Sequence, residues 1–120
     1  MRRLCILIAD ESVDAADALG ALCERFGHEV DFAYERAFAL EAARQLVPDV
    51  IFLELSLPRL DGFQLARELR SHAALQRTLL VAVGARDALR LARDAGFDAE
   101  LCKPLDADAV ELLLGRCYEG

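Results

Sequence analysis

Five segments with strand signals alternate with five segments of helical hydrophobic spacing along this chain of 120 residues. The strand segments lie at residues 4–9, 29–33, 50–55, 79–83 and 99–102, and residues 50–55 form the most apolar of them. The helical segments lie at residues 13–26, 36–47, 62–72, 86–95 and 107–117. Strict alternation with short connections predicts an α/β fold, in which helices cover both faces of a parallel sheet. We expect one domain over residues 1–120, with a doubly wound five-stranded sheet in the order 2-1-3-4-5.

Residues with strong local preferences stand at the ends of these segments. Ser12 and Asp106 occupy N-cap positions before the first and last helical segments. Gly27 follows the first helical segment and Gly96 follows the fourth, where glycine readily ends a helix, and Pro48 ends the second segment. The hydrophobic fraction of 55% is high for a globular domain and suits strands that are buried on both faces. These features favour a flavodoxin-like (βα)5 fold.

Composition excludes several classes of function. The net charge of −7 comes without a basic cluster, which argues against direct nucleic-acid binding by this domain. No stretch reaches the ~18 to 20 apolar residues that cross a bilayer, and only about six apolar residues follow the basic start of the chain, which disfavours a signal peptide. The four cysteines lack the spacing of a zinc site and indicate a reducing compartment. We expect a cytoplasmic domain with no membrane partner.

Charged residues stand at the carboxyl ends of three predicted strands. Asp10 and Glu11 follow the first strand, Glu54 lies at the end of the third, and Lys103 follows the fifth. In doubly wound sheets, binding sites lie at the carboxyl ends of the strands, beside the switch in strand order. The topology alone therefore predicts that three carboxylates and one lysine meet in a single patch.

Such a patch needs positive charge to be stable. At an effective dielectric constant of ~20, two like charges about 4 Å apart repel by about 4 kcal/mol. Lys103 supplies one positive charge, and a hydrated Mg²⁺, which prefers carboxylate oxygens, could supply more. Any one of these acidic residues, taken alone, is more simply interpreted as a solvated loop residue. Because charged residues stand at the ends of three strands together, the pattern favours a binding site.

The order and spacing of these motifs resemble the receiver domain of bacterial response regulators over essentially the whole chain. The matching positions are Asp10-Glu11, Glu54, Pro58, Asp61-Gly62 and Lys103-Pro104. The resemblance implies that Glu54 stands where the family has its phosphoaccepting aspartate, and that Lys103 contacts the phosphoryl group. It also implies that Asp10, Glu11 and Glu54 would hold any bound magnesium, and that the Lys103-Pro104 bond is cis, as is usual in the family.

The chain departs from the family pattern at positions that serve phosphorylation. The acceptor is Glu54 instead of aspartate, and the second acid of the pair is Glu11. The switch hydroxyl of the family falls on Val83 or Gly84, neither of which has a hydroxyl, and its aromatic switch residue falls on Glu100. We therefore expect that magnesium binding is weakened, that no cofactor is required, and that no residue is catalytic.

The leading hypothesis is an atypical receiver domain of two-component phosphorelay signalling that works as a phosphorylation-independent protein-interaction module and not as an enzyme. Glutamate is one methylene longer than aspartate, so the Glu54 carboxylate reaches roughly 1.5 Å further and could pair with Lys103. The alternative is an active, Mg²⁺-dependent phosphoacceptor with a non-standard site. A nucleotide or flavin binder is disfavoured, because the acidic residues 10–14 replace the glycine-rich loop that such sites use.

The resemblance also implies protein partners, namely a histidine kinase or an output domain or protein. In the family these bind through the fourth helix, fifth strand and fifth helix. Arg86, Arg90, Arg93 and Glu100 would then shape partner choice, and a homodimer is compatible with the same surface. His28, in the turn after the first helix, is expected to be an exposed loop residue.

Overall fold

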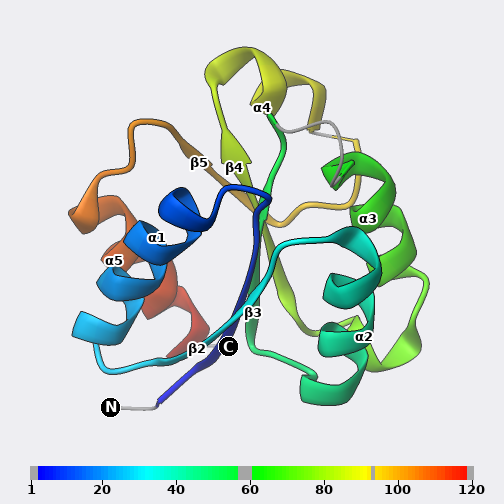
Figure 1. The fold of residues 1–120 in the computed structure, drawn as a ribbon, viewed down its shortest axis with the longest axis horizontal. Helices are drawn as coiled ribbons and strands as arrows, with labels where there is room; N and C mark the ends of the chain where they lie inside the picture. The colour runs from blue at the N-terminus through cyan, green and yellow to red at the C-terminus, as the bar shows by residue number, and fades with distance from the viewer. Residues whose placement is uncertain (1–2, 57–60, 93, 119–120) are drawn as a thin grey trace.

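The computed structural model describes residues 3–56, 61–92 and 94–118, and it contains one parallel sheet in the order β2-β1-β3-β4-β5 (Figure 1). The strands are β1 (Cys5–Ala9), β2 (Glu29–Ala33), β3 (Val50–Glu54), β4 (Leu79–Gly84) and β5 (Ala99–Cys102). The helices are α1 (Val13–Arg25), α2 (Arg36–Leu46), α3 (Gly62–Arg70), α4 (Arg86–Ala92) and α5 (Ala107–Gly115), with short 3-10 helices η1 (Ala73–Leu75) and η2 (Arg116–Tyr118). The predicted fold class and strand order are confirmed.

Helices cover both faces of the sheet, with α1 and α5 on one side and α2 and α3 on the other (Figure 1). Successive strand residues point to opposite faces, so each strand feeds two cores. In β1, Ile6 and Ile8 pack with α1 and α5, whereas Leu7 and Ala9 pack with α2 and α3. Burial on both faces explains why β1, β3 and β4 are almost continuously apolar in sequence, whereas β2 and β5 carry exposed acidic residues.

The predicted helix ends are found at most positions. The Ser12 hydroxyl accepts a hydrogen bond from the Ala15 N–H at 3.2 Å, and the Asp106 carboxylate accepts one from the Asp108 N–H at 3.0 Å. Gly27 adopts a φ of 93°, a left-handed conformation that favours glycine. These local contacts fix where α1 and α5 begin and where α1 must stop.

The fourth helix is shorter than predicted. The sequence pattern indicates a helix over residues 86–95, but α4 ends at Ala92. Beyond it, the Ala95 N–H donates to the Ala92 carbonyl at 3.0 Å, which is the tighter closure of a turn. Arg93 and the predicted loop residue Pro58 lie outside the described residues.

Arg70 ties together the end of the sheet that lies away from the predicted site. Its Nη1 donates to the carbonyls of Leu75 at 3.1 Å and Thr78 at 3.0 Å, and its Nε donates to the Gly96 carbonyl at 3.0 Å. Its Nη2 forms an ion pair with Asp98. One side chain therefore joins the last turn of α3 to the starts of β4 and β5.

The prediction that His28 is an exposed loop residue is wrong. Its relative exposure is 5%, and its Nδ1 accepts a hydrogen bond from the Leu4 N–H at 3.1 Å. Burial lowers the pKa of this imidazole, and the nearby Asp49 carboxylate partly opposes the shift. The turn after α1 folds back onto the amino end of β1, which buries a side chain that the sequence places in a loop.

Candidate functional site

The carboxyl ends of β3, β4 and β5 lie side by side, and they bring together the predicted residues Glu54, Val83 and Lys103. Glu54 is paired in register with Val83 of the neighbouring strand, and Lys103 donates its backbone N–H to the Gly84 carbonyl at 2.9 Å. In Figure 1 the chain continues from β4 into α4 at the top of the view. The topology thus positions the charged patch that strand order predicts.

Glu54 is the last residue of β3 and is almost fully buried, with a relative exposure of 1%. Its Oε1 accepts a hydrogen bond from the Ser56 N–H at 2.8 Å. Its Oε2 forms an ion pair with the Nζ of Lys103, but it accepts no hydrogen bond from the described residues. The Lys103 contact is therefore an electrostatic attraction more than an aligned hydrogen bond. The two oxygens of one carboxylate are each engaged by the protein itself.

Lys103 approaches this buried carboxylate from the surface. Its side chain is 37% exposed, against 1% for Glu54. The Lys103-Pro104 peptide bond that follows is cis, as the resemblance implies. The site therefore consists of a buried negative charge covered by a positive charge that keeps contact with water.

Asp10 lies next to this pair, at the end of β1, and has a relative exposure of 5%. Its Oδ1 accepts a hydrogen bond from the Ser12 N–H at 2.9 Å. Burial raises the pKa of the Asp10 carboxyl, and the Glu54 and Glu11 carboxylates raise it further, whereas the Ser12 N–H and Lys103 lower it. Asp10 is therefore electrostatically coupled to all three of the other charged residues that the sequence singled out.

The sequence singles out three carboxylates, Asp10, Glu11 and Glu54, as ligands for any bound magnesium. Within residues 3–56, 61–92 and 94–118, no three His, Cys, Asp or Glu side chains are grouped so that they could hold a metal ion. The oxygens of Glu54 face Ser56 and Lys103, and Oδ1 of Asp10 faces Ser12. These oxygens would have to exchange protein partners to become ligands of Mg²⁺, which prefers carboxylate oxygens and bound waters.

Gly84 faces the Glu54 carboxylate, whereas Val83 does not. The side chain of Val83 packs into the core beneath α1 and α5. A Cβ atom added to Gly84 would lie 3.4 Å from the Ser56 hydroxyl and 3.6 Å from Oε1 of Glu54. These distances identify Gly84 as the candidate switch position whose side chain would stand beside the Glu54 carboxylate.

Ser56 is a site residue that sequence reasoning missed. Its N–H holds Glu54, and its hydroxyl lies beside the space that a Gly84 side chain would fill. A side-chain oxygen that accepts from the N–H two residues further on is a common local motif of acidic residues in turns. The signal available in the sequence was that Ser56 lies two residues after Glu54, just beyond an apolar strand.

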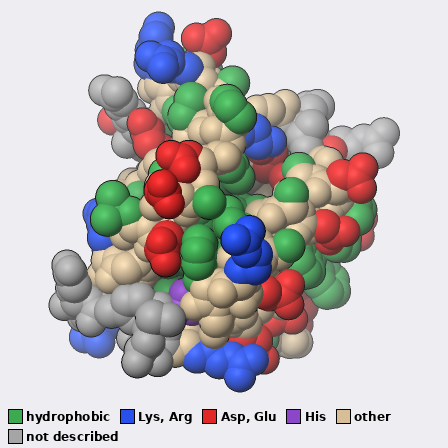
Figure 2. Space-filling view, turned by 90° about the vertical axis from the view of Figure 1, so that its left-hand side faces the viewer, with side chains coloured by type: hydrophobic (Ala, Val, Ile, Leu, Met, Phe, Trp, Pro, Cys, Tyr) green, Lys and Arg blue, Asp and Glu red, His purple; other side chains and the backbone are tan. Residues whose placement is uncertain are grey.

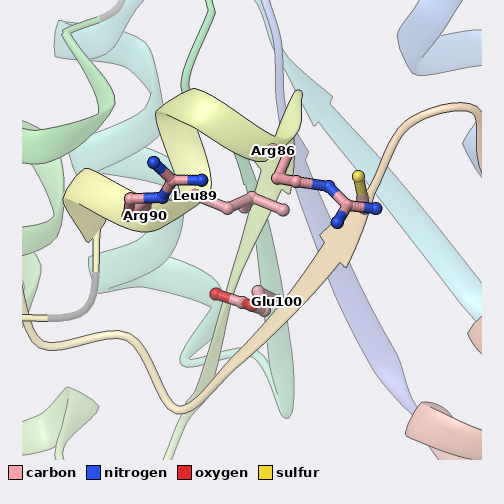
Figure 3. A pocket seen from close by; sticks show the side chains of 5 residues that line it. Arg86, Leu89, Arg90 and Glu100 are labelled. Carbon is pink, nitrogen blue, oxygen red and sulfur yellow. The ribbon is translucent and has the colours of Figure 1, made fainter.

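Glu100 lies away from the ion pair, on the outer surface of β5. It lines a shallow hollow of about 370 Å³ with Arg86, Leu89, Arg90 and Cys102. Figure 3 shows Arg86 and Arg90 extending from α4 on either side of Leu89, with Glu100 on the strand below them. None of the ion pairs found in the described residues involves these two arginines or Glu100. Their charges are therefore directed to solvent.

Comparison with known proteins identifies the family. Residues 6–114 match the response regulator receiver domain. The chain belongs to this family. The receiver domain is 35% identical over 105 residues to the gliding motility regulatory protein of Myxococcus xanthus, with 85% of this chain and 14% of that protein covered. It is 32% identical over 119 residues to the transcriptional regulatory protein PdtaR of Mycobacterium tuberculosis, with 95% of this chain and 58% of that protein covered.

The fold is shared with solved receiver structures. The chemotaxis response regulator CheY4 of Vibrio cholerae superposes with a TM-score of 0.86 at 20% identity, over 97% of this chain and 99% of that one. The chain spans 14% and 58% of the lengths of the two relatives above. It is thus a receiver domain of two-component signalling, a class of module that acts through protein partners. No helix in the described part of the chain is long and apolar enough to cross a membrane.

Proposed function

We propose that this receiver domain is a protein-interaction module of two-component signalling that works without being phosphorylated. The observation that carries the proposal is the Glu54 carboxylate, which is buried and already engaged by Lys103 and the Ser56 N–H. In this interpretation Glu54 stands at the phosphoacceptor position, and the donors that would otherwise contact a phosphoryl group are occupied by the protein's own side chain.

Several features around Glu54 oppose phosphoryl transfer. To accept a phosphoryl group, the carboxylate would have to leave both Lys103 and Ser56. In-line transfer depends on positioning, and an error of about 1 Å can cost ~100-fold in rate. Asp10, Glu11 and Glu54 place three acidic side chains near one another, and their charge would oppose an incoming phosphate. Each of these features weakens the two requirements of the reaction, which are alignment and charge neutralisation.

The groups that would report phosphorylation are also missing. Gly84 offers no hydroxyl to bind a phosphoryl oxygen, and Glu100 is not aromatic and lies exposed on β5. A conformational change requires contacts that differ between two states, and neither position supplies them. We infer that the ion pair of Glu54 and Lys103 holds the domain in one state, because it keeps a negatively charged group permanently against Lys103. The Glu54 carboxylate carries one negative charge, whereas a phosphoryl group would carry about two at neutral pH.

The partner surface in this proposal is the face formed by α4, β5 and α5. Arg86 and Arg90 project from α4 above Glu100 without ion-pair partners in the described residues (Figure 3). A histidine kinase or an output domain is the partner class that the family implies, and the cytoplasm is the proposed location. The charge reversal Arg90→Glu should weaken partner binding while leaving the melting temperature unchanged, because Arg90 is exposed.

The alternative function is an active, Mg²⁺-dependent phosphoacceptor. It is favoured by one observation, which is that Asp10, Glu54 and Lys103 do meet at the carboxyl ends of the strands. A rearrangement that turned Glu54 away from Lys103 would free the carboxylate for phosphorylation. Glu11 would then have to supply a further magnesium ligand.

Phosphorylation by acetyl phosphate with Mg²⁺, followed by intact mass and peptide mapping, separates the two functions. We expect no phosphate on the wild type, because its Glu54 carboxylate is not aligned for transfer. We also expect none on Glu54→Gln, because this variant lacks the carboxylate nucleophile. Glu54→Asp and the double variant Glu54→Asp/Gly84→Thr test whether the rest of the site still works. A stoichiometric phosphate on Glu54 of the wild type would establish the alternative and reject the proposal.

A further inference from the structure

Strand β2 forms one open edge of the sheet. The order β2-β1-β3-β4-β5 gives it a single neighbour, and in Figure 1 it runs between α1 on the left and α2 on the right. The Glu29 N–H donates to the carbonyl of Leu4, at the start of β1, at 3.0 Å. Alternate residues of a strand bond to the same neighbour, so Val30 and Phe32 direct their backbone groups away from β1. These donors and acceptors face a side on which the described sheet has no strand.

The two faces of this edge differ in character. Val30 and Phe32 turn toward α1, and the Phe32 ring stacks on the Tyr34 ring with 6.3 Å between their centroids. The Tyr34 side chain is 38% exposed, so the aromatic face reaches the surface. Glu29 and Asp31 stand on the opposite face of the strand, and both are exposed. A strand added to β2 would therefore present alternate residues to an aromatic face and to an acidic face.

The acidic face carries negative charge that the domain does not balance with an ion pair among the described residues. None of the ion pairs found there involves Glu29 or Asp31. Burial raises the pKa of the Cys5 thiol on the neighbouring strand, and nearby carboxylates, Asp31 foremost, raise it further. The chain carries a net charge of −7, and Figure 2 shows acidic side chains with hydrophobic ones between them on the side that carries α1 and α5. The edge therefore favours a basic occupant.

We propose that β2 is a docking site that takes up an extended, basic segment of a partner protein as an additional strand. The backbone groups of Val30 and Phe32 bind the backbone of that segment. Its lysine or arginine side chains lie across from Glu29 and Asp31, and its apolar side chains cover the Tyr34 ring. A second copy fits poorly, because an antiparallel pair of β2 strands would bring the acidic residues of both copies onto one face.

This site goes beyond the proposed function, because β2 and β5 are opposite edges of the sheet. A partner on the face of α4, β5 and α5 therefore leaves β2 accessible, and each surface can be tested without the other. The contact is expected to be weak on its own, since one short strand supplies it, and to add to the affinity of a partner that is bound elsewhere on the domain.

A labelled synthetic peptide of alternating lysine and valine residues is the probe for the charge pattern. Fluorescence anisotropy should show saturable binding to the wild type. Glu29→Lys/Asp31→Lys should weaken this binding at least about tenfold, since two cross-strand pairs change from attraction to repulsion. The matched control Asp94→Lys/Glu111→Lys changes the formal net charge equally at exposed positions outside β2, and its affinity should stay within about twofold of the wild type. A glutamate–valine peptide should bind Glu29→Lys/Asp31→Lys and not the wild type.

Amide hydrogen exchange measured by NMR separates strand addition from loose charge attraction. Bound peptide should slow the exchange of the Val30 and Phe32 amides, which face the open edge. The Glu29 and Asp31 amides already face β1 and should change little. A lysine–valine peptide that is N-methylated at every backbone amide keeps its charges and should not bind, because it has lost its donors.

Several results would overturn the proposal. They are a wild type that does not bind the lysine–valine peptide, an N-methylated peptide that binds equally well, and unchanged exchange of the Val30 and Phe32 amides. Equal weakening by Asp94→Lys/Glu111→Lys would show that net charge alone attracts the peptide. Exchange at Val30 and Phe32 that slows with rising protein concentration, without peptide, would identify a second copy as the occupant. All four substituted positions are exposed, so melting curves should show intact folding in both double variants.

Discussion

Glu54 and Lys103 form an ion pair in which the acid is buried and the base remains partly in water. The arrangement makes the two residues unequal, because removal of the lysine leaves a charge stranded in the interior, whereas removal of the acid leaves a lysine that water can solvate. The same asymmetry explains why the ion pair favours a single conformational state. In the described contacts, the buried Glu54 carboxylate has no cation other than Lys103 with which it could pair.

Lys103→Met should therefore destabilise the domain more than Glu54→Gln does. We expect roughly 1 to 3 kcal/mol for Lys103→Met, below the range for fully buried pairs because Lys103 is partly exposed. Glu54→Gln keeps an oxygen acceptor for the Ser56 N–H and should cost less. Urea unfolding at pH 7 measures both, and the double variant should recover part of the loss. Equal destabilisation by the two single variants would contradict the asymmetry.

Gly84 and Gly20 should respond oppositely to alanine. A Cβ on Gly84 meets Ser56 and Glu54 at ordinary contact distances, so Gly84→Ala should be neutral or stabilise by up to about 1 kcal/mol through the unfolded state. A Cβ on Gly20 would lie 2.5 Å from the Phe32 ring, so Gly20→Ala should cost about 1 to 3 kcal/mol. Thermal melting distinguishes them, and a large loss for Gly84→Ala would mean that the site is tighter than its geometry indicates.

The fold was predictable because β1, β3 and β4 are apolar on both sides and because cap residues such as Ser12 and Asp106 mark where helices begin. The sequence could not decide whether Val83 or Gly84 stands at the switch-hydroxyl position, because the resemblance places that position only to within one residue. An error of one residue matters in a strand, since neighbouring side chains point to opposite faces. Ser56 was missed because its contact is made by a backbone N–H, which every residue type except proline possesses. The site therefore became specific only with the distances around Gly84 and the Ser56 contact of Glu54.

Long-range contacts explain the remaining errors. His28 bonds to Leu4, 24 positions away, so nothing in the local sequence marks it as buried. Arg70 likewise reaches the Gly96 carbonyl across 26 positions. A helical pattern shows which face of a helix is apolar, but it does not show which loop will pack against a polar residue at its end.

Arg70→Met should cost about 2 to 4 kcal/mol, because three carbonyls and Asp98 lose a charged donor at once. Arg67→Met, on the same helix but exposed, is the matched control and should change stability by less than about 0.5 kcal/mol. Arg70→Lys should rescue only part of the loss, since a lysine cannot reproduce the planar fork of donors. Denaturant unfolding measures all three. If Arg67→Met were as harmful as Arg70→Met, the loss would reflect helix propensity instead of the network.

His28 should make stability depend on pH below about 6.5, its ordinary pKa in an unfolded chain. Burial lowers the pKa of the folded imidazole, so the unfolded state binds a proton first as the pH falls. Stability is therefore fully present above the unfolded pKa and is lost as the pH falls from there through the folded pKa. A protonated Nδ1 could no longer accept from the Leu4 N–H.

The variant His28→Asn isolates this contribution. Asparagine offers an oxygen near the position of Nδ1 but does not titrate, so the free energy of unfolding should vary less between pH 7 and pH 5 than in the wild type. The control is His72→Asn, at a position that follows α3 and is remote in sequence from His28, and this variant should leave the slope as it was. Urea unfolding across this pH range gives the slopes. An unchanged slope in His28→Asn, or a flattened one in His72→Asn, would assign the pH dependence to other groups.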